Sequence, residues 1–369
     1  MAALAGVGAA AAALARSTDW FSSLGGRASG DRLDRMRRSR QWSEPAERFV
    51  NSVPTHTMRA GEYGRAIHMQ IAATEARYPR RPIPVERRAR ADFETPPAGG
   101  LRVTWIGHAT TLVEIGGVRV LTDPVWSERV SPSTLAGPRR FFEPPIALAD
   151  LPPVDAVVIS HDHYDHLDMA TIRALAERGT TSFLVPLGVG AHLERWGVPA
   201  DRVRELDWGE SASVAGVTFT AAPARHFSGR RLGDKDATLW SSWVIAGASG
   251  RHRVFYSGDS GWFDGYREIG RRHGPFDLTI MSVGAYSPTW PLIHAVPEEM
   301  VQAHRDVRGD LLLPVHWGTF NLAFHGWTEP AERTLAAAAL GERTRVTVPR
   351  PGQMIDPANP PRLEEWWRE

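Results

Sequence analysis

The sequence contains no cysteine among its 369 residues. This absence excludes disulfide bonds, thiol nucleophiles, lipoprotein-type acylation and cysteine-ligated metals. Any metal ion that the side chains hold must therefore be bound by histidine, aspartate or glutamate.

The sequence also has almost no lysine and almost no net charge. Lys235 is the only lysine, so arginine carries the positive charge, and the formal net charge is only +1. A chain so close to neutrality creates no overall field that attracts nucleic acid, and an anionic partner must be recognised by a local patch. We therefore expect no nucleic-acid partner.

No apolar run reaches the length of a membrane span. Residues 1–16 are small and apolar, but no basic residue precedes them, and they are too short to cross a bilayer. We expect a flexible tail here, with a weak targeting or membrane-touching segment as the alternative. The expected location is the cytoplasm, including a peripheral position at the inner face of the membrane.

Residues 17–100 are rich in arginine and proline and poor in strand patterning. We expect an N-terminal arm that packs on the main domain. The alternative is an arm that meets anionic lipid headgroups, since each basic residue near such a surface adds about 1 kcal/mol.

Strand patterning begins at Leu101, and residues 101–369 are predicted to form one domain. The segment 101–125 alternates apolar and polar residues around a Gly-Gly pair, which predicts a β-hairpin that ends at Asp123. Further strands are expected in VDAVVIS, TSFLVP, VTFTAAPARH, LWSSWVIAG, HRVFYSGDS, DLTIMSVGAY and DLLLPVHW, with helices at 168–179, 296–307 and 329–341. Mixed order without a phosphate-binding glycine fingerprint favours a layered α/β domain over a Rossmann domain.

The segment HDHYDH, residues 161–166, is the strongest chemical signal in the sequence. It follows a buried strand and offers His161, His163, Asp165 and His166 within six positions. The first two histidines lie two apart in an extended segment, so both point to one side. One histidine pair and one Asp/His pair suit two adjacent metal ions with nitrogen and oxygen ligands, as zinc prefers.

Three further candidate ligands close other predicted strands. His226, Asp259 and His316 each follow an apolar run directly. Strand ends of a rigid sheet can bring distant segments to one site with little positional slack. Asp123, after VLT, is expected to be either a carboxylate that orients a metal-bound imidazole or part of an Asp-Pro turn.

The motifs as a set resemble the metallo-β-lactamase superfamily and, within it, the family of N-acylphosphatidylethanolamine-hydrolysing phospholipases D. The resemblance extends over about residues 101–330 and rests on TWIGHAT, LTDPV, SPSTLAGPRRF, LPPVDAVVISHDHYDHLD, VPLGVG, ELDWGE, SGDSGW, GPFDL, GAYSPTW, PEEM and HWGTF. It implies a four-layer αββα sandwich with an N-terminal arm and a site for two zinc ions.

The resemblance also implies roles for individual residues. One zinc ion would be bound by His161, His163 and His226, and the other by Asp165, His166 and His316, with Asp259 bridging the two. The expected catalytic residues are Asp165, Asp259 and His294, the last placed near the reacting phosphate. His108 is expected near the site without binding metal.

The expected function is hydrolysis of a phosphodiester, most of all of an N-acylphosphatidylethanolamine-type phospholipid, to phosphatidate and an N-acylethanolamine. The alternatives are a sugar-phosphate lactonase or small-ester hydrolase of the same superfamily and, more remotely, a non-catalytic metal-binding scaffold. A lipid substrate predicts an apolar groove near Trp126, Trp262 and Trp290, whereas a sugar phosphate predicts a closed, arginine-lined pocket. The expected partners are a phospholipid or other phosphodiester substrate, a peripheral membrane contact and a second copy of the chain.

The sequence departs from the family pattern at one point near His294. The segment TWPLIHAVPEE is shorter than in the family's animal members, and Ile293 stands where they have a glutamine. Because this segment shapes the substrate entrance, the family's acyl preference does not carry over to this chain.

Overall fold

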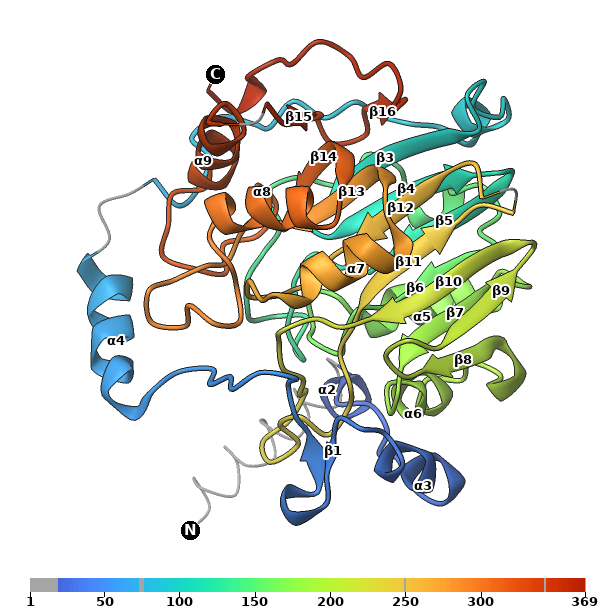
Figure 1. Ribbon diagram of the computed structural model, residues 1–369, viewed down its shortest axis with the longest axis vertical. Helices are drawn as coiled ribbons and strands as arrows, with labels where there is room; N and C mark the ends of the chain where they lie inside the picture. Colours follow the sequence, from blue (N-terminus) through green and yellow to red (C-terminus); the bar gives the residue numbers. More distant parts are fainter. Residues whose placement is uncertain (1–18, 73–75, 249, 342, 369) are drawn as a thin grey trace, which may run out of the picture.

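Two large β-sheets are stacked face to face, and helices cover their outer faces (Figure 1). The computed structural model describes residues 19–72, 76–248, 250–341 and 343–368. The tail expected at residues 1–16 therefore lies outside the described residues. The predicted layered α/β sandwich is confirmed.

The first sheet has seven strands. In spatial order they are β16 (Met354–Ile355), β3 (Leu101–Gly107), β4 (Thr110–Ile115), β5 (Val118–Thr122), β6 (Ala156–Val158), β7 (Ser182–Pro186) and β8 (Val203–Leu206). The pairs from β16 to β5 are antiparallel, and those from β5 to β8 are parallel.

The second sheet also has seven strands. In spatial order they are β15 (Arg345–Val346), β14 (Gly309–Val315), β13 (Phe276–Ser282), β12 (Arg253–Tyr256), β11 (Ser242–Ala246), β10 (Val217–Ala222) and β9 (Ser211–Val214). Here β9 to β12 pair antiparallel and β12 to β15 pair parallel.

Helices pack on both outer faces of the sandwich. Those on the first sheet are α5 (Met169–Glu177) and α6 (Gly190–Arg195), and those on the side of the second sheet are α7 (Gly265–His273), α8 (Pro297–Asp306) and α9 (Glu329–Ala338) (Figure 1). Helix α5 begins where the side chain of Asp168 accepts a hydrogen bond from the amide of Ala170, which satisfies one free donor of its first turn. The predicted helices at 168–179, 296–307 and 329–341 correspond to α5, α8 and α9.

The alternation of side chains along the strands divides the core into two layers. In β6, Val158 points between the sheets, whereas Val157 points toward α5 and α6. In β7, Leu184 and Phe183 divide in the same way. Because successive strand residues face opposite sides, a strand covered on both faces must be apolar throughout. This is why the predicted strands appear as continuous apolar runs.

The predicted hairpin at 101–125 is wrong in one respect. The Gly-Gly pair does form the turn between β4 and β5, but the chain reverses a second time at His108, so that the segment forms three strands. His108 has a φ of 53° and follows Gly107 with a φ of 135°, which is left-handed backbone that a tight reversal requires. This reversal brings His108 to the same edge as the metal-ligand candidates.

The described part of the N-terminal region runs along the main domain (Figure 1). It contains α2 (Trp20–Ser23), α3 (Asp31–Arg37), the β1 and β2 pair (Trp42–Ser43 and Arg48–Phe49) and α4 (Tyr63–Ala72). Arg32 forms ion pairs with Glu194 at 2.5 Å and Glu205 at 2.7 Å. Short 3-10 turns occur at Glu44–Ala46, Ala60–Glu62, Arg90–Phe93, Leu148–Asp150, Ala200–Arg202 and Trp366–Arg368.

Within the described ranges, no helix has both the length and the apolar character needed to cross a bilayer.

Candidate metal centre

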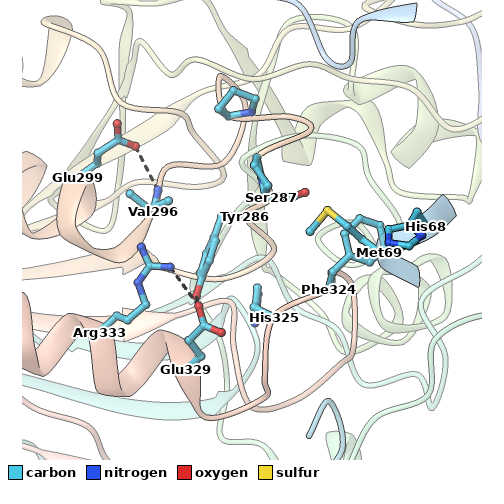
Figure 2. Close-up of a pocket in the computed structure, with 12 residues that line it drawn as sticks. His68, Met69, Tyr286, Ser287, Val296, Glu299, Phe324, His325, Glu329 and Arg333 are labelled. Carbon is cyan, nitrogen blue, oxygen red and sulfur yellow. Dashed lines mark hydrogen bonds and ion pairs between the residues drawn. The ribbon is translucent and has the colours of Figure 1, made fainter. Parts of the chain in front are cut away.

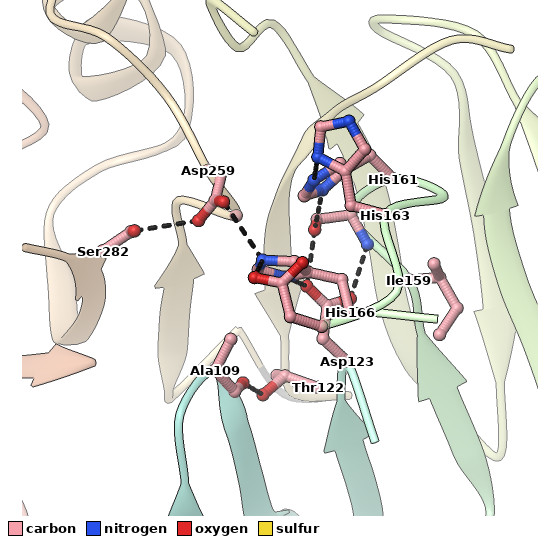
Figure 3. Close-up of polar contacts among 12 residues, drawn as sticks. Ala109, Thr122, Asp123, Ile159, His161, His163, His166, Asp259 and Ser282 are labelled. Carbon is pink, nitrogen blue, oxygen red and sulfur yellow. Dashed lines mark hydrogen bonds and ion pairs between the residues drawn. The ribbon is translucent and has the colours of Figure 1, made fainter. Parts of the chain in front are cut away.

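The candidate ligands lie at the ends of four strands that belong to two different sheets. Residues 161–166 follow β6 in the first sheet, whereas His226, Asp259 and His316 follow β10, β12 and β14 in the second. Because the sheets are stacked, these four strand ends meet at one edge of the sandwich. Figure 3 shows Asp259, from the second sheet, pointing toward His166, which follows β6 of the first.

Three imidazoles form the first group of donor atoms. Nε2 of His161 lies 2.7 Å from Nδ1 of His163, which lies 3.4 Å from Nε2 of His226. Each of the three residues offers one nitrogen within 4.8 Å of the others. These nitrogens are close enough to bind one metal ion.

The second group consists of Asp165, His166, His316 and Asp259. Five separations between Oδ2 or Nε2 atoms of these four residues lie between 3.1 and 3.3 Å. A tetrahedral zinc site with bonds of about 2.0–2.1 Å has ligand atoms about 3.3–3.4 Å apart. The four atoms therefore fit the coordination shell of a zinc-sized ion.

Asp259, a member of the second group, also approaches the first group. Its Oδ2 is 3.1 Å from Nε2 of His166 and 3.9 Å from Nε2 of His226. Its other oxygen, Oδ1, accepts a hydrogen bond of 2.9 Å from the hydroxyl of Ser282 (Figure 3). This position is the one that a bridging carboxylate requires.

Two glycines allow the strand ends to approach so closely. A Cβ at Gly284 would lie 1.9 Å from the carbonyl oxygen of His316. Gly258, directly before Asp259, has a φ of 54°, and a Cβ there would lie 2.6 Å from the Cβ of Ser160. A side chain at Gly284 would displace the backbone of His316, and one at Gly258 would displace Ser160, which directly precedes His161.

Hydrogen bonds fix the orientation of the imidazoles. Nδ1 of His166 donates to Oδ2 of Asp123 at 2.6 Å, and Nδ1 of His226 donates to the carbonyl of Ile293 at 2.9 Å. Nδ1 of His161 lies 2.9 Å from the hydroxyl of Ser160, which donates to Asp123. When the far nitrogen carries the proton, the Nε2 lone pair is free to bind a metal.

Asp123 is the most connected of the supporting residues. It accepts hydrogen bonds from His166, from the amide of Ser160 at 2.6 Å and from the buried hydroxyl of Tyr256. These are the contacts of a carboxylate that orients a ligand, which was one of the two interpretations of this residue from sequence.

His108 lies beside the second group. Its Nε2 is 2.9 Å from Oδ2 of Asp165, and its ring centroid is 4.0 Å from that of His316. Burial, together with the neighbouring His316, lowers the pKa of His108 to about 3, so the ring is neutral and donates to the carboxylate. The structure thus places His108 in contact with a candidate ligand, close enough that it could also serve as one.

His294 approaches the centre from the segment before α8. Its Nδ1 lies 3.9 Å from Oδ2 of Asp259 and has no hydrogen-bond partner among the described residues. Burial lowers the pKa of His294 to about 4, so the imidazole is uncharged at neutral pH. It shares one cluster of donor atoms with His226 and Asp259.

The two groups differ in their electrostatics. Burial and neighbouring imidazoles lower the pKa of His161 and His226 well below the usual value. Burial alone would also lower the pKa of His316, but Asp259 and Asp165 outweigh it and raise that pKa to about 8. The first group is therefore neutral at pH 7, whereas the second holds a proton.

Three supporting residues were not found by sequence reasoning: Ser160, Tyr256 and Ser282. Each lies in a strand or directly after one, and each points its hydroxyl at a candidate site residue. Only the position of Ser160, directly before His161, could have suggested such a role. The other two depend on how the sheets pack.

A pocket of about 390 Å3 opens onto the centre. Its lining combines the candidate residues His163, Asp165, Asp259, His294 and His316 with Thr57, Met58, Tyr63, Phe227, Ala285, Trp290, Ile293 and Leu322. Of the three tryptophans expected at a groove, only Trp290 is among them. Trp126 packs against the core between the first sheet and its helices, and Trp262 packs against the core that includes the interface of the two sheets. The prediction that these two tryptophans lie at a groove beside the metal centre is therefore wrong.

Comparison with known proteins identifies the fold family. A family model described as "Beta-lactamase superfamily domain" matches residues 118–317, which include all seven predicted metal ligands. The chain belongs to the metallo-β-lactamase superfamily. The isothiocyanate hydrolase from Delia radicum gut bacteria has the same fold, with a TM-score of 0.55 and 20% sequence identity over 69% of this chain and 98% of that one.

Relatives by sequence place the chain in the N-acylphosphatidylethanolamine-hydrolysing phospholipase D-like family of metallo-β-lactamases. It is 39% identical over 249 residues to "N-acyl-phosphatidylethanolamine-hydrolyzing phospholipase D 1" of Caenorhabditis elegans, covering 64% of this chain and 69% of that protein. It is also 52% identical over 325 residues to an uncharacterized protein of Mycobacterium tuberculosis, covering 87% and 86% of the two chains. The protein is thus a metallo-β-lactamase-fold hydrolase with a candidate His/Asp metal site.

Replacing Asp123 tests the orienting contacts of this metallo-β-lactamase site. We expect Asp123→Asn to weaken metal binding by about 10–100-fold, because the orienting acceptor of His166 loses its charge. Competition with a fluorescent chelator measures the affinity. Asp155→Asn is the matched control. Asp155 accepts a hydrogen bond from the amide of Arg119, near the start of β5, whereas Asp123 follows the end of β5. Equal affinities for the two variants would contradict the assigned role of Asp123.

The raised pKa of His316 predicts that metal binding depends on pH. A metal ion must displace the proton that His316 carries below about pH 8. Apparent affinity should therefore fall as the pH is lowered from about 8.5 to 6.5, by up to about tenfold per pH unit for each displaced proton. Calorimetric titration in two buffers of different ionisation enthalpy counts the protons released. An affinity that stays constant, with no proton release, would disprove this prediction.

Proposed function

We propose that this protein is a di-zinc phosphodiesterase of the phospholipase D type, with an N-acylphosphatidylethanolamine-type phospholipid as substrate. Hydrolysis would join a water oxygen to phosphorus and break the bond from phosphorus to the alcohol oxygen. The products are phosphatidate and an N-acylethanolamine. The named C. elegans relative supports this substrate class.

The observation that carries the proposal is the composition of the metal pocket. Beside the polar centre its wall is apolar, formed by Met58, Tyr63, Phe227, Trp290, Ile293 and Leu322. No arginine occurs among the described residues that line it. This lining suits acyl chains and disfavours the sugar-phosphate alternative, for which arginines would be expected around the pocket.

A larger cavity of about 590 Å3 adjoins the metal pocket. The two meet where the ring of Trp290 contacts the ring of Phe324, with centroids 5.2 Å apart. Met69 and Phe324 form part of its lining, whereas Arg333 in it is already paired with Glu329 (Figure 2). This space extends the apolar surface beyond the metal pocket and could accept a long chain.

The ligand groups would hold two divalent ions. Such ions supply Lewis acidity, which lowers the pKa of water to about 7 and neutralises charge on phosphoryl oxygens. Asp165 and Asp259 would provide the negative charge that holds such ions, and Asp259 lies close to His166 and His226, one from each group. Asp123 and Ser282 hold their partners in position through hydrogen bonds.

His294 is the residue best placed to contact the substrate. It lines the pocket, and its Nδ1 has no partner among the residues that the structure describes. Because its pKa is about 4, the ring is neutral at pH 7. It would therefore donate an N–H hydrogen bond to a phosphoryl oxygen or to the leaving alcohol rather than transfer a proton as an imidazolium.

Membrane contact is part of the proposal, and α4 is the element that supports it. Tyr63 and Ile67 lie one turn apart on this helix, at 59% and 61% exposure, and Tyr63 also lines the metal pocket. Exposed apolar side chains at the mouth of a pocket are typical of surfaces that meet lipid.

Replacing a shared ligand tests the proposed reaction. We expect Asp259→Asn to reduce hydrolysis of N-acylphosphatidylethanolamine by at least about 100-fold, since even loss of outer contacts at metal sites costs 10–100-fold. The release of N-acylethanolamine is measured by mass spectrometry. Leu340→Ala, at an exposed position just after the end of α9, is the control.

The same assay should include a phosphorylated lactone and a small carboxylic ester. Wild-type protein that cleaves either of these but not the phospholipid would overturn the substrate assignment. Absence of any turnover by the metal-loaded protein would favour a non-catalytic scaffold.

A further inference from the structure

A cavity of about 600 Å3 beside the metal pocket is lined by three arginines: Arg129, Arg139 and Arg140. We call it the arginine cavity. Leu322 lines both this cavity and the metal pocket, so the two spaces adjoin. The substrate proposal above assigns no role to the arginine cavity.

Arg140 is fixed in place and nearly buried, with 7% of its surface exposed. Its Nε donates to the carbonyl of Ser127 at 3.1 Å, and its Nη2 donates to the carbonyl of Val125 at 2.9 Å. Its Nη1 has no hydrogen-bond partner within the described part of the chain. The guanidinium therefore keeps unused donor capacity in a rigid position.

The charges around the arginine cavity do not balance. Arg139 is paired with Glu128, whereas Arg129 donates only to the carbonyl of Gly137, at 2.7 Å. In the described ranges, neither Arg129 nor Arg140 has a carboxylate within ion-pair distance. Arg129 thus lines this space without a carboxylate partner, and the buried guanidinium of Arg140 adds a second unneutralised charge behind its wall.

Burial makes this imbalance costly for Arg140. Desolvation lowers the pKa of its guanidinium to about 10, and the carboxylates of Asp168 and Glu143 offset only part of this effect. The group stays charged at neutral pH, and a buried charge without a partner is unfavourable. An anion bound by Arg129 and Arg139 in the cavity would place negative charge near Arg140 and offset part of this cost.

A chain of side-chain contacts also leads from Arg140 to the metal centre. The guanidinium of Arg140 lies 5.4 Å from the ring centroid of Phe320. That ring lies 5.2 Å from the ring of His108, whose Nε2 contacts Asp165. Only two side chains therefore separate Arg140 from a candidate metal ligand.

We propose that the arginine cavity is a binding subsite for a phosphate-type oxyanion, separate from the metal ligands. Guanidinium groups match the geometry of phosphate oxygens and bind them through two parallel hydrogen bonds. The volume leaves room for a group attached to the phosphate, as in a phosphorylated small molecule or an anionic lipid headgroup. This inference does not depend on the reaction proposed above.

Calorimetric titration of the full chain with inorganic phosphate tests the proposal. The variant Arg129→Gln/Arg139→Gln removes two charges, and it spares Arg140, whose contacts hold the loop. We expect its dissociation constant for phosphate to rise at least about tenfold, since charge-assisted hydrogen bonds to phosphate are lost. Arg271→Gln is the matched control, because Arg271 is an exposed arginine that pairs with Glu268 on α7.

A second arm separates the arginine cavity from the metal centre, because divalent ions also bind phosphate. Phosphate binding that persists in His161→Ala but weakens in the double arginine variant supports the subsite. Phosphate binding that disappears in His161→Ala and is unchanged in the arginine variant overturns it, provided that the third arm is also negative.

The third arm identifies the source of the oxyanion. Sedimentation with phosphatidylcholine vesicles, with and without phosphatidylglycerol, measures binding to headgroups. If binding to the anionic vesicles is weaker in the double arginine variant, the subsite binds a lipid headgroup. If only the binding of inorganic phosphate is weaker in that variant, the subsite binds a soluble phosphate compound. If neither probe depends on these arginines, the proposal is wrong.

Discussion

The stacking of the two sheets forces nitrogen and oxygen donor atoms from four strand ends to within about 3 Å of one another. Without a cation, the lone pairs of His161 and His163 and the charges of Asp165 and Asp259 would face each other in a buried space, which is unfavourable. These side chains stay close together because the packed strands of both sheets fix their positions. The site is therefore preorganised to bind a cation. The free energy of folding offsets the cost of holding these donor atoms together.

Much of this arrangement could be predicted from sequence, because each ligand follows an apolar run and strand ends meet at a sheet edge. The HDHYDH segment and the positions of His226, Asp259 and His316 required no knowledge of the packing. The reversal at His108 was missed, since alternating residues predicted one long strand and the left-handed backbone is visible only in three dimensions. Tyr256 was missed for a related reason: it appears in sequence as an ordinary core residue, and its contact with Asp123 spans two sheets.

The surroundings of the centre separate into an apolar region and a cationic one. Trp290 and Ile293 belong to a wall that can accept hydrocarbon, whereas Arg129 and Arg139 line a neighbouring cavity. Leu322 lies on the boundary between them. A molecule with both an acyl chain and an anionic group would match this division, which the metal ligands alone do not specify.

The most direct test of the account is the metal content of the purified protein, measured by elemental analysis together with X-ray absorption at the zinc edge. The account predicts two zinc ions per chain, with nitrogen and oxygen neighbours at about 2.0–2.1 Å, no sulfur, and a second metal within about 4 Å. Protein that is folded and zinc-saturated during expression yet retains no divalent ion after gel filtration would contradict it.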